Sequence, residues 1–472
     1  MRRPHDFRAI ADRIGADIAA GRLRPGERLP PQRAFARRHG IAASTAERAY
    51  GELVRRGLVV GEVGRGTFVR AAAPQPTGRA LTEPAAEEPV ALVPGEPSAP
   101  VNLELNYPSV PGQSELLAPA LAPLLRPDVL TEALRPAPVT GTASAREAAS
   151  DLLAVPGWRP DPAGLLFTGN ARQAIAAALA SLVRPGGRVG VEELTYPLVK
   201  EIAGRLGCTL VPLLGDADGP LPDALAATHR TAPLSALYLQ PTLHNPTARS
   251  MSAGRRHELA EAVRGLAIPV VEDRIWSFLD AATGTAPFAA HAPELTHVVD
   301  GLSKRVAPGL TVGFLVVPPR RVETVAAAVR SGGWSAGRFA LEAGVRWIGD
   351  GTVARLVAAK RADAVRRQGV LAEVLDGFRV RSDPRAYFAW WELPAPWRAD
   401  TFTAAAAAHG IAVTPGSAFA VDPRRTPDAV RLGLGSARLP DLERALRVLG
   451  GVVRGAGRGV PSGPSARWSP RP

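Results

Sequence analysis

A proline- and alanine-rich stretch at residues 71–100 divides this chain of 472 residues into two unequal parts. The stretch contains seven prolines and eight alanines and lacks aromatic residues. Proline fixes φ and removes a backbone donor, and this segment has too little periodic apolar surface to pack. We therefore expect a linker between a small domain at residues 1–70 and a large domain at residues 101–454. The Gly-, Pro- and Ser-rich end, residues 455–472, predicts a disordered tail.

Composition narrows the classes of protein to consider. Cysteine occurs once, at Cys208, so an intramolecular disulfide is excluded and a Cys/His zinc site is disfavoured. Apolar runs are shorter than a membrane helix requires, and the first residues lack the apolar stretch of a signal peptide, so we expect a cytoplasmic protein. Residues 1–70 hold 15 Arg against 7 acidic residues, which is most of the net charge of +13. This concentration suggests a polyanionic partner, although a high-GC genome that writes basic positions as Arg also explains it.

The first 70 residues alternate helix signals with helix breakers. Apolar residues on one face predict a first helix from Phe7 to Ile18, and two prolines precede a second helix that ends near His39. Ser44, followed three residues later by Glu47, predicts an N-cap with a capping box for a third helix. The block is therefore expected to contain three short helices.

Two short β-rich runs, residues 58–60 and 67–69, flank the glycines around Arg65 and predict a β-hairpin with a basic tip. Three helices followed by a hairpin is the order of a winged helix-turn-helix, in which residues 43–56 form the recognition helix. Arginine contacts either guanine or phosphate in such domains. The alternative is that these arginines only solubilise a small helical domain.

The run RLRPGERLPPQRAFARRHGIAASTAERAYGELVRRGLVVGEVGRGTFV resembles the DNA-binding domain of the GntR family of bacterial regulators. The resemblance implies double-stranded DNA as a partner. It places these residues at the family's DNA contacts: Arg28, Arg33, Ser44, Thr45, Arg48 and Gly66. Arg65, at the hairpin tip, is a further candidate. Ala43 lies where many members carry a polar or basic residue, so we expect a different operator sequence.

From about residue 160, short β-rich runs alternate with longer helical ones. The β-rich runs are residues 165–168, 188–191, 235–239, 268–272, 297–300 and 313–317, and helices are expected at 171–183 and 197–206. This alternation predicts an α/β layer with a largely parallel sheet. Ligands of such sheets bind at the C-terminal ends of the strands.

Four of these strand ends carry residues with useful chemistry. Asn170 and Ala171 begin a helix whose free N–H groups suit a phosphate, and Asn245 places an amide in an Asn-Pro turn. Asp273 supplies an acid. Lys304 is one of only three lysines in the chain, and a guanidinium cannot replace an amine that forms a Schiff base. Together these are the components of a pyridoxal phosphate site, whereas Lys304 by itself could equally be a surface cation.

Residues 100–453 resemble fold-type I aminotransferases, and the whole arrangement resembles MocR-type regulators, a GntR subfamily with such a domain appended. The matching segments, in the family's order, are TGNARQAI, EELTYP, LQPTLHNPT, VVEDRIW and LSKRVAPGL. The resemblance implies a small α+β winged helix-turn-helix followed by an α/β aminotransferase-like domain that binds pyridoxal 5′-phosphate and forms a homodimer. By similarity, Lys304 forms a Schiff base with the cofactor and Asp273 pairs with its pyridinium nitrogen. Asn245 would meet the ring phenolate oxygen, and Tyr196 would stack on the ring.

The resemblance also implies how the phosphate and an effector are held. The backbone N–H groups of Asn170 and Ala171 and the Ser303 hydroxyl match the family's phosphate ligands. Arg431, in the segment VRLGLGSA, matches the arginine that binds a substrate carboxylate with a bidentate fork. A small amino compound is therefore the expected effector.

Three positions depart from the family's pattern. Trp276 stands where the family usually has a tyrosine that bonds the phenolate oxygen. Gly301 replaces a phosphate-binding serine, and Thr311 replaces the arginine that clamps the phosphate. Each lost charge-assisted bond costs about 1.5–3 kcal/mol. Arg305 is a candidate substitute, and we expect weaker cofactor binding than in a metabolic aminotransferase.

These observations favour a transcriptional regulator whose aminotransferase-like domain senses pyridoxal phosphate or an amino compound condensed with it. Two alternatives stay open. The protein could be a working aminotransferase whose basic domain at residues 1–70 plays no part in its activity, or a regulator whose second domain has lost its cofactor and only dimerises. The sequence lacks GxxxxGK, GxSxG and HExxH motifs, which disfavours a P-loop nucleotide site, a serine-hydrolase elbow and a zincin site.

Overall fold

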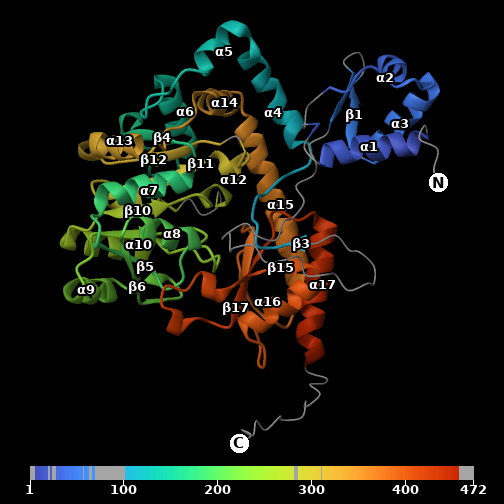
Figure 1. Ribbon diagram of the computed structural model, residues 1–472. Helices are drawn as coiled ribbons and strands as arrows, with labels where there is room; N and C mark the ends of the chain where they lie inside the picture. Colours follow the sequence, from blue (N-terminus) through green and yellow to red (C-terminus); the bar gives the residue numbers. More distant parts are fainter. Residues whose placement is uncertain are drawn as a thin grey trace, which may run out of the picture. The chain divides into compact units, whose positions relative to one another are not determined.

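The computed structural model describes residues 6–19, 22–23, 28–56, 58–62, 66–69, 101–280, 285–309 and 311–456. These residues fall into two compact units, one within residues 1–77 and the other within residues 78–472, and each is described by itself (Figure 1). The linker predicted at residues 71–100 lies outside the described residues. The predicted tail does so only from residue 457 onward, because the last helix continues through Gly455 and Ala456.

The small unit has the predicted order of three helices and a hairpin. Its elements are α1 (Phe7–Ala19), α2 (Gln32–His39), α3 (Ala43–Arg55), β1 (Val59–Glu62) and β2 (Gly66–Val69). The two strands pair antiparallel. Buried side chains from all three helices, among them Ile10, Phe35 and Leu53, form one core with the hairpin residues Val59 and Val69.

The predicted cap of α3 is wrong. The N-cap is Ala42, which has no side-chain capping bond, and Ser44 is already inside the first turn. The reason is the preceding turn, in which Gly40 takes a left-handed conformation with φ of 62° and ends α2. The short connection lets α3 begin at Ala43, so the Ser44 hydroxyl is exposed rather than used as a cap.

The large unit is built around a seven-stranded sheet with the order β4-β12-β11-β10-β9-β5-β6. The strands are β4 (Leu165–Thr168), β5 (Arg188–Glu192), β6 (Thr209–Leu213), β9 (Ala236–Leu239), β10 (Val270–Asp273), β11 (Thr296–Gly301) and β12 (Gly313–Val316). Only β12 runs against its neighbours in this sheet, which confirms the largely parallel prediction.

Helices cover both faces of this sheet. On β9, Ala236 and Tyr238 belong to one core cluster, and Leu237 and Leu239 belong to another. Successive side chains of a strand point to opposite faces, so this division requires a helical layer on each side. The helices are α4 (Gln113–Leu121), α5 (Pro127–Ala133), α6 (Ala143–Leu153), α7 (Ala171–Leu182), α8 (Pro197–Arg205), α9 (Pro222–Thr231), α10 (Ala253–Leu266), α11 (Phe288–His291), α12 (Leu302–Arg305), α13 (Val322–Ser331) and α14 (Arg338–Gly349). A small hairpin pairs β7 (Gly215–Asp216) with β8 (Gly219–Pro220).

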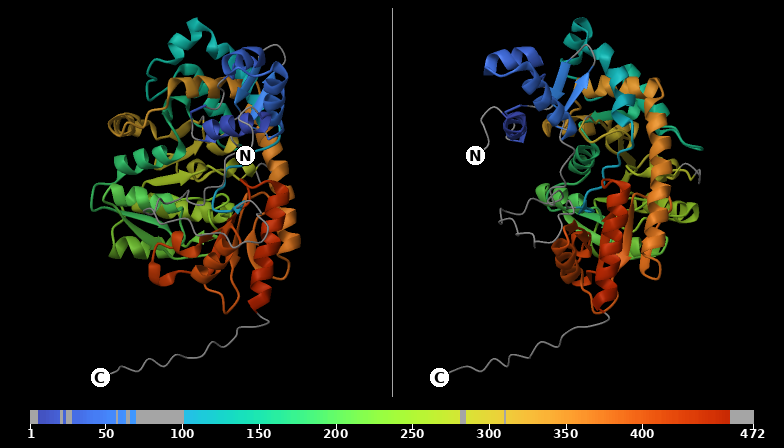
Figure 2. Two further views of the ribbon diagram at one scale, coloured as in Figure 1. Left: turned by 45° about the vertical axis from the view of Figure 1, so that its right-hand side comes forward. Right: turned by 90° about the vertical axis from the view of Figure 1, so that its right-hand side faces the viewer.

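A second, antiparallel sheet follows in the sequence, with the order β13-β14-β17-β16. Its strands are β13 (Arg379–Ser382), β14 (Phe388–Glu392), β16 (Thr414–Pro415) and β17 (Ala429–Gly433), and the helices of this region are α15 (Thr352–Val374), α16 (Ala399–Ala408) and α17 (Leu439–Ala456). Helices α15 and α17 pack side by side (Figure 2). The first described strand of the large unit, β3 (Val101–Asn102), pairs in parallel with β15 (Ile411–Ala412) and leads into residues 104–107. None of the helices in the described ranges has the length and apolarity that crossing a membrane requires.

Candidate functional site

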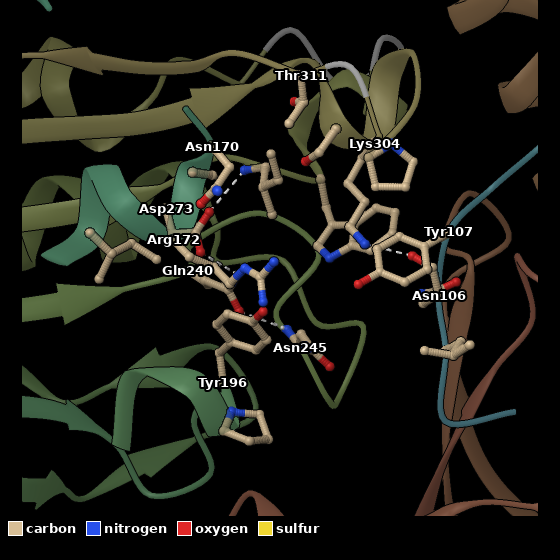
Figure 3. A pocket seen from close by; sticks show the side chains of 18 of the residues that line it. Asn106, Tyr107, Asn170, Arg172, Tyr196, Gln240, Asn245, Asp273, Lys304 and Thr311 are labelled. Carbon is tan, nitrogen blue, oxygen red and sulfur yellow. Dashed lines mark hydrogen bonds between the residues drawn. The ribbon is translucent and has the colours of Figure 1, made fainter. Parts of the chain in front are cut away.

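The C-terminal ends of the strands open into a pocket with about 950 Å³ of empty volume, including its open mouth (Figure 3). The structure brings nearly all the residues predicted for the cofactor and effector together around it. Those that line the pocket are Asn170, Ala171, Tyr196, Asn245, Asp273, Trp276, Ser303, Lys304 and Arg431. Arg305 is the exception. The predicted residues therefore meet in one pocket at the strand ends.

Lys304 lies on α12, directly after β11. Its Nζ donates a hydrogen bond to the Asn106 carbonyl oxygen at 2.6 Å and lies 4.1 Å from the centroid of the Tyr107 ring. Burial, together with neighbouring positive charges, lowers the pKa of this amine to about 7. Much of the amine is therefore neutral at physiological pH, and a neutral amine is the nucleophile that attacks an aldehyde.

Asp273, the last residue of β10, is fixed by three donors. Its Oδ2 accepts hydrogen bonds from the Tyr238 hydroxyl at 2.6 Å and from Gln240 Nε2 at 2.9 Å, and its Oδ1 accepts one from the Ile275 N–H at 2.9 Å. Burial raises the pKa of the carboxyl to about 6. A buried carboxylate that is costly to leave unpaired suits a cationic ring nitrogen.

Gln240 connects the acid to the amide turn, and the sequence analysis missed it. Besides donating to Asp273, its Oε1 accepts a hydrogen bond from the Asn245 backbone N–H at 3.1 Å (Figure 3). Gln240 lies inside the matching segment LQPTLHNPT and is buried. An amide side chain directly after a predicted strand is the sequence feature that could have identified it. One side chain thus sets the positions of two predicted cofactor ligands.

Four pocket residues carry a buried polar atom that has no hydrogen-bond partner within the described part of the chain. These atoms are Asn106 Nδ2, Asn245 Oδ1, Thr311 Oγ1 and Arg431 Nε. Buried polar atoms in proteins are nearly always paired. The lining is therefore made for a polar ligand with several donors and acceptors, as a phosphorylated pyridine ring is, and the residues present fit pyridoxal phosphate.

The start of α7 lies at one end of the pocket, called here its phosphate end because the sequence predicts phosphate binding there. Asn170 caps the helix, and its side chain accepts a hydrogen bond from the Gln173 N–H at 3.1 Å. The N–H groups of the first helical turn lack intrahelical acceptors and attract anions. Gly313 allows β12 to approach this turn, because a Cβ there would lie 2.4 Å from the Asn170 carbonyl carbon.

The two departures at the phosphate end have different structural settings. At Gly301, a Cβ would approach the Val312 carbonyl oxygen to 2.7 Å, so a serine has no room without movement of the backbone. Thr311 lines the pocket with its hydroxyl unpartnered, as noted above. Neither residue supplies a positive charge for the phosphate.

Arg305 does not reach the pocket, so the prediction that it replaces the missing arginine is wrong. Its side chain is buried, forms an ion pair with Asp300 and donates to the Gly301 carbonyl oxygen at 3.1 Å. Successive residues of a helix differ in direction by about 100°. Because Lys304 faces the pocket, the next residue of α12 turns into the protein interior.

Arg431 and Trp276 both line the pocket. Arg431, on β17, is buried and donates to the Glu104 carbonyl oxygen and, at 3.1 Å, to Thr414 Oγ1. Burial lowers the pKa of Arg431 to about 10. Trp276 lies with its ring centroid 5.1 Å from Lys304 Nζ and packs against other aromatic rings. It therefore presents an aromatic face to the amine in the place of the family's tyrosine.

Tyr196 and the segment Glu104–Tyr107 complete the pocket. Tyr196 precedes α8, and burial raises the pKa of its hydroxyl, so the ring stays neutral. The segment Glu104–Tyr107, hereafter the strap, follows β3 and supplies the carbonyl oxygens that hold Arg431 and Lys304. The sequence analysis missed the strap because it carries no motif. It also missed Arg172, which lines the pocket inside the segment TGNARQAI.

In the small unit, the side chains of Arg28, Arg33, Ser44 and Arg48 are exposed, and Thr45 is half-buried. Ser44, Thr45 and Arg48 lie in the first two turns of α3. Gly66 has φ of 124°, and a Cβ there would lie 2.6 Å from Arg28 Nε, so the glycine admits this arginine beside the hairpin. Arg65 lies outside the described residues.

Comparisons with known proteins identify both units. Residues 131–449 match the family model of class I and II aminotransferases, and residues 7–69 match that of bacterial regulatory proteins of the gntR family. An uncharacterized HTH-type transcriptional regulator of Bacillus subtilis is 27% identical over 94% of this chain and 93% of its own length.

A more distant match is the HTH-type pyridoxine biosynthesis transcriptional regulator PdxR of Corynebacterium glutamicum, which is 26% identical over 68% of this chain and 69% of its own length. Among solved structures, the α-aminoadipate aminotransferase LysN of Thermus thermophilus, complexed with N-(5′-phosphopyridoxyl)-L-leucine, has the same fold. It superposes with a TM-score of 0.67 at 23% identity and covers 75% of this chain and 92% of that one. The chain therefore belongs to the class I and II aminotransferase family and, with its gntR-type domain in front, is a MocR-type transcriptional regulator.

Proposed function

We propose that this regulator senses an amino compound through pyridoxal 5′-phosphate held at Lys304, and that the occupied pocket changes its affinity for DNA. Membership of the aminotransferase family implies this cofactor. The observation that carries the proposal is that Lys304, which is half-buried, and Arg431, which is buried, face the same pocket and are both held by the strap. An amine with a lowered pKa and a carboxylate-binding arginine are the two groups that an amino acid needs.

Each predicted ligand has a separate task. When bound, pyridoxal phosphate supplies an aldehyde that condenses reversibly with amines and a ring that withdraws electrons. Asp273 holds a proton at the ring nitrogen, and Asn245 donates to the ring oxygen. Tyr196 covers one face of the ring and excludes water. The N–H groups at the start of α7 and the Ser303 hydroxyl orient the phosphate.

The strap gives the pocket a route to the DNA-binding unit. It is the first pocket segment after the residues that connect the two units in the chain. In the structure Lys304 donates to Asn106 and Arg431 donates to Glu104. Attachment of pyridoxal phosphate would take the Lys304 amine from Asn106, and the carboxylate of an amino acid would take Arg431 from Glu104, so each ligand would release one carbonyl oxygen of the strap. A ligand changes the affinity for DNA only if it binds one arrangement of the protein more tightly than another. We propose that the two arrangements differ in whether Lys304 and Arg431 hold the strap, so that a ligand of these residues favours one of them.

We also propose a homodimer located in the cytoplasm, where its DNA is. Two small units then read two half-sites of one operator, because paired heads match the twofold symmetry of such sites. The candidate DNA contacts are the residues predicted from the sequence: Arg28, Arg33, Ser44, Thr45, Arg48, Arg65 and Gly66.

The proposal is tested by titrating the purified chain with pyridoxal phosphate and recording both the visible absorbance band and the affinity for operator DNA. We expect a band in the natural protein, its absence from Lys304→Ala, and a change of DNA affinity on adding amino acids that only the natural protein displays. Trapping with borohydride and mass spectrometry should locate the adduct on Lys304. Identical spectra of the two proteins contradict the proposal.

A second candidate is a working aminotransferase. It is favoured by the simultaneous presence of Lys304, Asp273 and Arg431 in one pocket. Transfer of the amino group from an amino acid to a keto acid, at a rate unaffected by removing residues 1–70, supports this second function.

A further inference from the structure

The phosphate end of the pocket needs a cation. A phosphate monoester carries a charge of about −1.5 to −2 at neutral pH, and in this chain its expected ligands there are N–H groups and a hydroxyl. Thr311 and Gly301 supply no charge, and Arg305 is paired with Asp300 in the protein interior. The positive charge that balances the phosphate must therefore come from another residue.

Arg172 has the right position for this task. It follows Ala171 in the first turn of α7 and lines the pocket together with Ser303 and Thr311. Figure 3 shows its side chain extending from this helix end into the pocket. Arg172 is thus a cationic residue of the pocket lining in the helix turn whose N–H groups are predicted to bind the phosphate.

The exposed side chain of Arg172 has no acidic partner within the described part of the chain. Within the described part of the chain, its guanidinium forms neither a hydrogen bond nor an ion pair, although most arginines of the large unit do. A cation in the first turn of a helix is also disfavoured, by about 0.3–1 kcal/mol, because the N-terminal end of the helix dipole is positive. Because the side chain is exposed, water solvates the guanidinium, and a bound anion would give it a partner of opposite charge.

The charge of Arg172 is felt inside the pocket. It contributes to the lowered pKa of Lys304, after burial and Arg431, and it opposes the rise in the pKa of Tyr196 that burial causes. Both residues belong to the predicted cofactor site. Arg172 therefore contributes to a positive electrostatic potential in the pocket, and an anionic ligand would reduce this potential.

We propose that Arg172 binds the phosphate of pyridoxal phosphate and replaces the clamping arginine that Thr311 displaces. This inference rests on the proposed binding of the cofactor. The guanidinium forms a charge-assisted hydrogen bond to a phosphate oxygen, from the helix end whose N–H groups hold the same phosphate. The same chemistry suits an effector carboxylate, so the experiment must separate the two anions.

The experiment compares pyridoxal phosphate with pyridoxal, which has the same aldehyde but lacks the phosphate. Both are titrated into the full-length natural protein and into Arg172→Gln, and binding is followed by absorbance and by quenching of tryptophan fluorescence. We expect Arg172→Gln to bind pyridoxal phosphate about ten- to a hundredfold more weakly and pyridoxal unchanged. Arg205→Gln is the matched control, because Arg205 is exposed at the end of α8 and lies outside this pocket.

A second variant tests the replacement directly. Adding Thr311→Arg to Arg172→Gln should restore most of the lost affinity for pyridoxal phosphate, because it returns a cation to the family's usual place. Equal weakening for both compounds, or unchanged affinity for pyridoxal phosphate, overturns the inference. So does a loss confined to the affinity for an amino acid, which would assign Arg172 to a carboxylate. A natural protein that binds neither compound contradicts the proposed function, and this inference with it.

Discussion

The chemistry of Lys304 is set by its burial. Only the neutral amine attacks an aldehyde, and with a pKa of about 7 its neutral fraction rises as pH increases through neutrality. We expect the rate of attachment of pyridoxal phosphate to rise about fivefold between pH 6 and pH 7 and to level off above pH 8. Stopped-flow absorbance measures this rate. Nα-acetyl-lysine in solution is the control, because its attachment rate keeps rising toward pH 10.

If attachment to the protein also keeps rising above pH 9, the amine is not desolvated in the way the structure indicates. A plateau near neutrality in the protein, beside a continuing rise in the control, assigns the difference to the pocket.

Gln240 offers a second test at this scale. Replacing it by methionine keeps the volume but removes a donor to buried Asp273 and an acceptor for the Asn245 N–H. Leaving buried polar groups unpaired costs about 1–3 kcal/mol each. We expect Gln240→Met to lower the free energy of unfolding by about that amount in urea denaturation and to raise the pKa of Asp273 further. An unchanged unfolding midpoint would show that water replaces both bonds.

Site residues could be predicted where a family motif specifies the residue type, as it does for Lys304, Asp273 and Asn245. Direction could not be predicted for Arg305, because chain position does not say how α12 is turned against the sheet. Arg172 was overlooked since the family's contact there comes from the backbone. In each case the missing information is orientation, which packing decides.

Among the elements, the strap is the one whose environment depends on the ligand. The N–H groups of Glu104 and Leu105 donate to Asn102 Oδ1, and the Tyr107 N–H donates to Ser436 Oγ. Attachment of pyridoxal phosphate should release the Asn106 carbonyl oxygen from Lys304, and an amino acid carboxylate should release the Glu104 carbonyl oxygen from Arg431, so these amides should exchange faster when both are added. Hydrogen exchange with mass spectrometry measures this. Exchange that slows or stays constant, in protein that displays the cofactor band, contradicts the proposed route.

Six of the seven strands of the large sheet lie within two residues of the predicted positions, because each is short, apolar and bounded by turn residues; β6 was not predicted. The expected start of β10 at residue 268 was too early, since Pro269 lacks an N–H and the ladder begins at Val270. The second sheet was not assigned in advance. The separate pair of β3 with β15 was not assigned either, because its strands are some 310 residues apart and local patterns do not reveal such pairs.

For the whole molecule, the two units have separate hydrophobic cores. We therefore expect a fragment of residues 101–472 to keep the cofactor band and the affinity for pyridoxal phosphate while losing DNA binding. Spectral titration and gel-shift measurements on the same preparation check both halves of this statement. The full-length protein is the control. Loss of the band from a folded fragment would mean that the head contributes to the cofactor site.

The scarcity of lysine has a consequence for how the protein meets its surroundings. Of the three lysines, Lys360 is fully buried and donates to the carbonyl oxygens of Lys304 and Val306, and Lys200 donates to carbonyl oxygens near the end of the pocket wall. Lys360 is thereby closed to acetylating or glycating metabolites, and the half-buried amine of Lys200 is occupied by backbone carbonyl oxygens. Among the three lysines, Lys304 is the one whose amine faces the pocket, and the pocket selects what reacts with it.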